Sequence, residues 1–167
     1  MSVYVLGRDE LHDTIVSLAK MGSAASPCHI ILAEDNPADV GLVRAALHEH
    51  QVECDLRVIS DGEEVLTFLE KIDQNSALPC PDLFLLDLHL PKRDGSEILI
   101  RLRASERCGQ TPVVILTSSD SPWDQETAQR NAALHYFRKP SSLSQFMLLG
   151  TIVKQIVGHG PLCSPET

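Results

Sequence analysis

The chain has 167 residues, of which 43% are hydrophobic and 22% are charged, a balance typical of a globular protein with a sizeable core. A formal net charge of -9 argues against a nucleic-acid-binding surface, which needs a basic stripe, and an aromatic content of 4% argues against a platform that stacks on bases. No apolar run approaches the length of a membrane span, and charged residues interrupt the apolar residues near the N-terminus. We therefore expect no signal peptide and a cytoplasmic location.

Short apolar runs alternate with helical patterns along most of the chain. The first strand is predicted at residues 29–36, and the helix behind it begins at Pro37 with Asn36 as its cap. A second strand is predicted at residues 54–60, and a helix at residues 63–72 carries its apolar side chains on one face.

The same alternation continues after a proline-containing loop. The further elements are a strand beginning at Leu83, a helix from Gly95 to Cys108-Gly109, a strand at residues 112–120, a helix beginning at Ser121-Pro122, a strand at residues 134–140 and one long helix at residues 142–158. Nearly continuous apolar strands indicate burial on both faces, hence a parallel sheet covered by helices on each side. The predicted fold is a doubly wound α/β domain with five strands in the flavodoxin-like order 2-1-3-4-5.

The cysteines are scattered and form neither a CxxC pair nor a Cys/His metal spacing. They are Cys28, Cys54, Cys80, Cys108 and Cys163. An odd, scattered set is typical of reduced intracellular thiols, so we expect each to be a small core or loop residue.

Polar residues gather where the predicted strands end. Glu34 and Asp35 leave the first strand, Asp87 the third, Thr117 the fourth and Lys139 the fifth. The ligand of a doubly wound sheet binds at this edge. Three carboxylates there would repel one another unless a cation such as Mg²⁺ joins them, and a hydroxyl with a lysine suits phosphate. Each residue alone could serve as a cap or a turn, but together they indicate phosphoryl transfer onto Asp87.

The stretches "LAEDN", "LFLLDLHLPKRDG", "VVILTSS" and "YFRKP" resemble the receiver domain of two-component response regulators over about residues 28–158. The motifs "EDNPADV" and "DLHLPKRDG" are most similar to those of single-domain regulators that serve phytochrome-type histidine kinases. The resemblance implies that Asp87 accepts a phosphoryl group from a kinase histidine. It also implies that Asp35 and Asp87 bind Mg²⁺ with the backbone carbonyl of His89, while Glu34 holds a metal-bound water.

The resemblance assigns further roles at the fourth and fifth strands. Thr117 and Lys139 would hold the phosphoryl oxygens, and the bond between Lys139 and Pro140 would be cis. Tyr136 stands where the family keeps an aromatic residue that turns inward on activation. The surface of the fourth helix, fifth strand and fifth helix would then change shape, as a two-state switch.

The last helix has two apolar faces, although an outer helix needs only one. One face would pack on the sheet through Leu143, Phe146, Met147, Gly150, Val153 and Val157. The other consists of Leu148, Leu149, Ile152 and Ile156. The second face suggests either a homodimer, which the resemblance favours, or a chain extension folded over it.

The predicted domain boundaries are an N-terminal extension at 1–27, a receiver domain at 28–158 and a C-terminal tail at 159–167. The extension includes a possible short amphipathic helix at residues 9–20. We expect no output domain, so output would depend on protein–protein contacts.

Three alternatives remain open. A phosphatase of the haloacid-dehalogenase type would also use a strand-end aspartate with Mg²⁺, but it usually needs a second aspartate where His89 stands. A flavodoxin-type FMN carrier would need a phosphate loop after the first strand, where Glu34 and Asp35 would repel the phosphate. A receiver fold that works without phosphorylation is the third, although no essential residue is missing.

Overall fold

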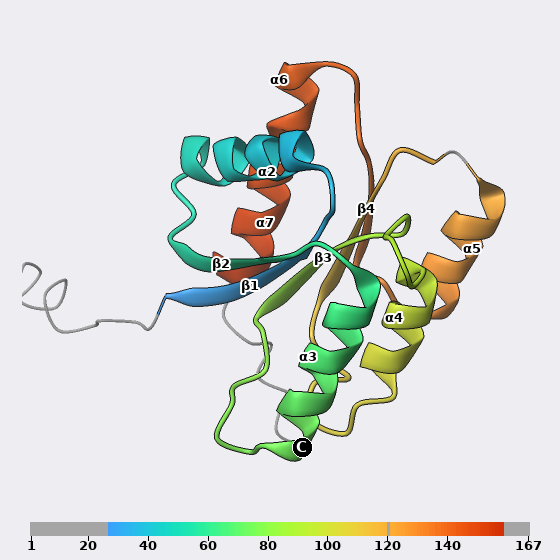
Figure 1. The fold of residues 1–167 in the computed structure, drawn as a ribbon. Helices are drawn as coiled ribbons and strands as arrows, with labels where there is room; N and C mark the ends of the chain where they lie inside the picture. Colours follow the sequence, from blue (N-terminus) through green and yellow to red (C-terminus); the bar gives the residue numbers. More distant parts are fainter. Residues whose placement is uncertain (1–26, 120, 159–167) are drawn as a thin grey trace, which may run out of the picture.

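The computed structural model describes residues 27–119 and 121–158, which build a five-stranded sheet between two layers of helices (Figure 1). The strands are β1 (Cys28–Ala33), β2 (Cys54–Ile59), β3 (Leu83–Asp87), β4 (Val113–Thr117) and β5 (His135–Arg138). All neighbouring strands pair in parallel, in the order β2-β1-β3-β4-β5. The predicted fold and strand order are confirmed.

The helices divide between the two faces of the sheet. One layer holds α2 (Pro37–Glu49), α6 (Leu143–Phe146) and α7 (Leu148–Gly158), and the other holds α3 (Gly62–Gln74), α4 (Gly95–Arg103) and α5 (Pro122–Arg130). Alternate strand residues supply the two cores, because successive side chains of a strand point to opposite faces. On β3, Leu83 and Leu85 pack against the first layer, while Phe84 and Leu86 pack against the second.

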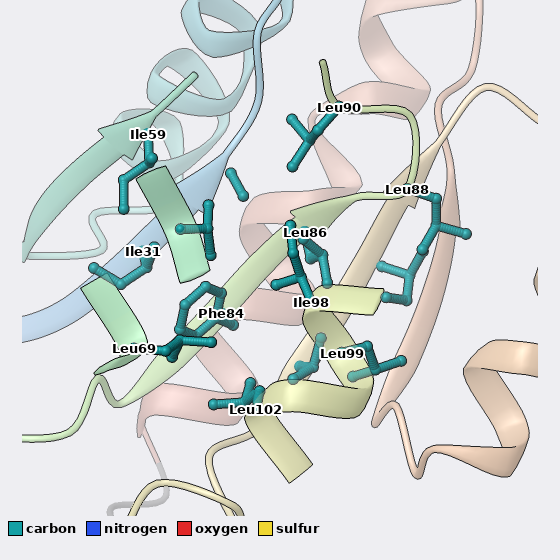
Figure 2. Packing of buried hydrophobic residues seen from close by; sticks show 14 of the residues in the cluster. Ile31, Ile59, Leu69, Phe84, Leu86, Leu88, Leu90, Ile98, Leu99 and Leu102 are labelled. Atoms are coloured by element: carbon teal, nitrogen blue, oxygen red, sulfur yellow. The ribbon is translucent and has the colours of Figure 1, made fainter. Parts of the chain in front are cut away.

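We call these cores the α2–α7 core and the α3–α5 core. The α2–α7 core includes Ile30, Leu32, Val43, Ala46, Leu47, Leu85, Val114, Leu116, Phe137, Phe146, Leu149 and Val153. Figure 2 shows residues of the α3–α5 core, which include Ile31, Ile59, Leu69, Phe84, Leu86, Ile98, Leu99 and Leu102. The two cores fix the sheet from both sides, and thereby fix the positions of the side chains at its carboxyl edge.

The last helix differs from its prediction. It is interrupted at Met147, where the amide of Gly150 donates to the Met147 carbonyl, so α6 and α7 are separate helices. Leu149 lies three positions after the buried Phe146 and is itself fully buried in the α2–α7 core, while Leu143, the first residue of α6, is exposed. Assigning Leu149 to an exposed face and Leu143 to the buried one was therefore wrong.

Gly150 lies where α7 crosses α2. A Cβ atom at this position would overlap the carbonyl oxygen of Ala46 and the ring of His50, so only glycine allows the two helices to approach this closely. The crossing fixes α2, whose first turn opens beside the carboxyl edge of the sheet.

A disulfide joins Cys80 and Cys108, whose Cα atoms lie 5.5 Å apart, so the prediction that all cysteines are reduced was wrong. Spacing could not reveal the pair, because the two residues are 28 positions apart and meet only through the fold. Cys28 and Cys54 are free thiols. The cysteine pattern thus no longer supports a cytoplasmic location, which stays a prediction.

Polar contacts reinforce the same region between α3 and α4. The carboxylate of Asp73 accepts hydrogen bonds from the Ser105 hydroxyl and from Arg101. These contacts hold the pKa of Asp73 below its ordinary value, the serine hydroxyl contributing most. The helix after Gly95 also ends earlier than predicted, at Arg103, and a series of turns continues to Gln110.

The predicted extension and tail, with the possible helix at residues 9–20, fall almost entirely outside the described residues, so those boundaries stay predictions. Within the described part of the chain, no helix combines the length and the apolar character that crossing a bilayer requires.

Candidate functional site

Three predicted site residues meet at the carboxyl edge of the sheet. Glu34 directly follows β1, Asp87 ends β3 and Lys139 directly follows β5. Strand alternation places them on the same side, because Leu32, Leu85 and Phe137, each two positions earlier, belong to the α2–α7 core.

The ammonium group of Lys139 is the centre of this cluster. Its Nζ atom lies 2.6 Å from Oδ2 of Asp87, 2.7 Å from Oε2 of Glu34 and 2.9 Å from Oδ2 of Asp39. The side chains of Lys139, Glu34 and Asp87 are only 10%, 1% and 8% exposed. A lysine ammonium has three donors, so all of its hydrogen-bonding capacity is used in these contacts.

The charges of the cluster are strongly coupled. Burial raises the pKa of Glu34, although its hydrogen bonds from Lys139 and from the Asn36 amide act to lower it. Burial acts to lower the pKa of Lys139, but its hydrogen bonds to the carboxylates of Asp87, Glu34 and Asp39 outweigh this and raise it. Lys139 therefore stays charged, and the cluster has an excess of negative charge whenever its acids are ionised.

Asp39 was not predicted to belong to the site. It lies in the first turn of α2, where an acid also complements the helix dipole, and this ordinary role concealed its contact with Lys139. The signal that could have found it is its place at the start of the helix after β1, since that helix begins at the same edge of the sheet as the strand ends.

The second oxygen of Asp87 faces its own loop. Oδ1 accepts a hydrogen bond of 2.9 Å from the backbone amide of His89, and Nδ1 of the exposed His89 side chain lies 4.0 Å from it. Gly95 closes this loop tightly, because its amide donates to the Leu88 carbonyl and a Cβ atom there would overlap the Asp87 carbonyl oxygen. The loop thus holds Oδ1 of Asp87, while Lys139 holds Oδ2.

Thr117 and Tyr136 lie on the other side of the sheet. Thr117 is completely buried, and its hydroxyl accepts from the amide of Ser119, whose carbonyl accepts from the hydroxyl of Tyr136 at 3.3 Å. Tyr136 packs against the α3–α5 core. The amide of Lys139 donates to the Thr117 carbonyl at 2.8 Å, and this backbone contact joins the two halves of the site.

The bond between Lys139 and Pro140 is trans, so the cis bond implied by the resemblance is wrong for this structure. The two isomers of a bond before proline differ by only about 1 kcal/mol, and trans is the one intrinsically favoured.

Asp35 does not join the lysine cluster. Its side chain is exposed, although that of its neighbour Glu34, directly after β1, is buried. Among the described residues, no group of three histidine, cysteine, aspartate or glutamate side chains is arranged to hold a metal ion. The chemistry of the donors nevertheless fits Mg²⁺, because Glu34, Asp35 and Asp87 supply hard oxygen ligands and Lys139 alone does not balance the acids of the cluster.

The comparisons with known proteins agree with one family. The family model described as "Response regulator receiver domain" matches residues 30–149. The transcriptional regulatory protein TrcR of Mycobacterium tuberculosis is 37% identical over 122 residues, which cover 73% of this chain and 43% of TrcR. The response regulator Rcp1 of Synechocystis is 37% identical over 98 residues, which cover 59% of this chain and 67% of Rcp1. The chain thus spans less than half the length of TrcR.

Two solved structures show the same fold. The phosphorylated cyanobacterial phytochrome response regulator RcpA superposes with a TM-score of 0.70 at 31% identity, covering 78% of this chain and 93% of RcpA. The Mn²⁺-bound form of Rcp1 superposes with a TM-score of 0.70 at 28% identity, covering 84% of this chain and all of Rcp1. With a family match over most of its length, the chain belongs to the response regulator receiver domains.

Proposed function

We propose that the protein is a phosphorylation-controlled signalling module in which Asp87 accepts a phosphoryl group from the histidine of a sensor kinase. The observation that carries this proposal is the contact between Lys139 and Asp87 at the carboxyl edge of a parallel sheet. Nζ of Lys139 lies 2.6 Å from Oδ2 of Asp87, and the lysine side chain is only 10% exposed. A carboxylate held against a buried ammonium can attack phosphorus and leave a positive charge beside the phosphoryl oxygens.

The transfer has a simple bond balance. A carboxylate oxygen of Asp87 forms a bond to phosphorus, while the bond from phosphorus to the kinase imidazole nitrogen breaks and the nitrogen keeps the electron pair. Lys139 then donates to the phosphoryl oxygens, and Thr117 supplies a hydroxyl from β4. When bound, Mg²⁺ would neutralise negative charge at the carboxylates and at the phosphoryl group.

The residues proposed to hold Mg²⁺ are Asp35 and Asp87 directly, His89 through its backbone carbonyl and Glu34 through a water molecule. Support comes from their oxygen donors and from the related Rcp1, which was solved with Mn²⁺. The likeness to the phytochrome response regulator RcpA also supports a phytochrome-type kinase as the partner.

We propose that the signal leaves through the surface of α5, β5 and the last helical segment, α6 with α7, by a change of equilibrium between two states. Tyr136 on β5 and the loop after β4 are already connected through Ser119, so a movement of Thr117 would reach Tyr136. Trp123 in the first turn of α5 is 68% exposed and available for contact with a partner. The single-domain character stays a prediction.

The labelling experiment uses the full chain with Mg²⁺ and acetyl phosphate, with mass spectrometry locating the label. The expected result is one phosphoryl group on Asp87, and a change in the fluorescence of Trp123, the single tryptophan of the chain, on adding beryllofluoride. Asp87→Asn should abolish both, while Asp55→Asn, which removes an acid near the start of β2, should leave both unchanged. Turnover of a phosphoester without a modified Asp87 would instead support a phosphatase.

We also propose a homodimer that uses the outer side of α7. Leu148 is 56% exposed, and Ile152 and Ile156 are partly exposed beside it. Sedimentation should show a dimer that Leu148→Asp dissociates and that Ile100→Asp, on the opposite helical layer, does not. A wild-type protein that sediments as a monomer with and without beryllofluoride would refute the dimer.

A further inference from the structure

Among the described residues that contact the ammonium group of Lys139, Asp39 is the one to which the proposed function assigns no task. Its Oδ2 atom lies 2.9 Å from Nζ of Lys139, and its side chain is 21% exposed. Neither the predicted metal ligands nor the predicted phosphoryl contacts include it, yet it takes one of the three donors of a buried ammonium.

We propose that Asp39 is a positioning residue that anchors the ammonium group of Lys139 beside Asp87 during phosphoryl transfer. The inference rests on the proposed function, because it assigns Asp39 a role in the reaction of Asp87. Asp39 itself touches neither the phosphoryl donor nor the reacting oxygen, so it acts only through Lys139.

The contacts of Lys139 explain why an anchor is needed. Two of its partners, Glu34 and Asp87, change their surroundings in the proposed reaction, since one is to hold a metal-bound water and the other is to carry the phosphoryl group. A flexible lysine side chain that lost both contacts would be free to turn toward solvent. Asp39 is the remaining carboxylate of the cluster whose charge and chemistry do not change, so its hydrogen bond persists while the other two are exchanged.

The backbone of Asp39 is well fixed for this purpose. The Asn36 side chain caps α2 by accepting from the Ala38 amide at 3.0 Å, and the body of the helix packs into the α2–α7 core through Val43 and Leu47. An anchor on a capped, packed helix loses little conformational entropy when it holds a charged partner.

The competing explanation is that Asp39 only complements the dipole of α2. Glu63 provides the matched control, because it is also an acid in the first turn of a helix, α3, and its carboxylate takes no part in the Lys139 cluster. A dipole effect should be similar in Asp39→Asn and Glu63→Gln, whereas an anchoring effect belongs to Asp39 alone.

The first experiment measures the rate of Asp87 labelling by acetyl phosphate over a range of Mg²⁺ concentrations. Loss of one charge-assisted hydrogen bond predicts that Asp39→Asn lowers the maximal rate about tenfold. The Mg²⁺ concentration at half-maximal rate should change by no more than about twofold, because Asp39 is not a proposed metal ligand. Asp39→Glu, which keeps the carboxylate, should recover part of the rate, and Glu63→Gln should react like the wild type.

The second experiment tests whether Asp39 acts through Lys139. In a Lys139→Met background, Asp39→Asn should cause no further loss of labelling rate, because the group that it positions is absent. Urea unfolding without Mg²⁺ of the wild type, Asp39→Asn, Lys139→Met and the double variant measures the coupling of Asp39 and Lys139 in the resting state, independently of phosphorylation. The losses of unfolding free energy in the two single variants should not add up to the loss in the double variant.

The outcomes separate this inference from the proposed function. An equal loss from Asp39→Asn with and without Lys139, or a main effect on the Mg²⁺ dependence, would overturn the anchoring role while leaving Asp87 as the acceptor. A normal rate in Asp39→Asn would do the same. If the wild type takes no label, the proposed function fails, and the anchoring role fails with it even where the unfolding cycle shows coupling.

Discussion

Replacing Lys139 with methionine should destabilise the resting protein strongly. The substitution keeps much of the side-chain volume but removes the ammonium that contacts Glu34, Asp39 and Asp87 at 2.6 to 2.9 Å. Two of these acids are nearly inaccessible to water, so water cannot replace the lost contacts. Breaking a buried ion pair by removing one partner typically costs about 3–5 kcal/mol, and because the third acid, Asp39, is 21% exposed we expect about 3 kcal/mol at pH 7.

The loss should depend on pH in a defined direction. Without the ammonium, burial raises the pKa of Glu34 in the folded state with less opposition than in the wild type. A raised carboxyl pKa contributes stability at low pH, and this contribution disappears as the pH rises through the folded value. The difference in unfolding free energy between Lys139→Met and the wild type should therefore be largest at neutral pH and shrink toward acid pH.

Urea unfolding followed by circular dichroism measures the effect, with the slope of free energy against urea expected to stay unchanged. Lys154→Met, which removes an exposed lysine of α7, controls for the change in net charge. Mg²⁺ should stabilise Lys139→Met more than the wild type, because a cation no longer competes with the ammonium for the same oxygens. Equal unfolding midpoints for Lys139→Met and the wild type at pH 7 would refute the idea that Lys139 compensates the buried acids.

Three further predictions concern stability. Gly150→Ala should lower the unfolding free energy in urea by about 2 kcal/mol, because the added methyl group overlaps a carbonyl oxygen of α2. Gly41→Ala, which has open space around it, should leave the unfolding free energy unchanged or raise it. An equal rise in both variants would refute the close crossing of the two helices. Reducing the Cys80–Cys108 disulfide should lower the unfolding free energy by about 3 kcal/mol, and identical urea midpoints with and without a reductant would contradict this. The pKa of Asp73 is lowered in the folded state, so its carboxylate stabilises the fold at neutral pH. This stabilisation is lost as the pH falls below 3.8, the ordinary pKa of an aspartate. The loss of unfolding free energy in Asp73→Asn should accordingly be largest at pH 7 and shrink as the pH falls below 3.8, and a pH-independent difference would speak against the lowered pKa.

The order of strands and helices was predictable because each element carries its own local signal. The strands are short apolar runs, the helices have apolar residues at helical spacing, and Asn36 followed by Pro37 marks a helix start that the structure confirms. The association of Glu34, Asp87 and Lys139 was predictable as well, since parallel strands bring their carboxyl ends to one edge.

The differences arise where the signal is not local. No proline or glycine stands at position 147, so one continuous helix was predicted across the interruption. Leu149 lies at the border between the two apolar faces, and the packing of α7 on α2 decides that it is buried. Asp39 looked like an ordinary first-turn acid, because its distance from Lys139 depends on how α2 packs on the sheet. The bridge between Cys80 and Cys108 likewise depends on two loops meeting in space.

That bridge makes a covalent ring of the segment that contains β3, the loop after Asp87 and α4. Lys92 and Arg93 lie exposed in this ring, within reach of trypsin-like proteases. A cut beside either residue would open the backbone without separating the fragments, which would part on a gel only after reduction. The oxidised protein can thus be nicked a few residues after Asp87 and remain one molecule.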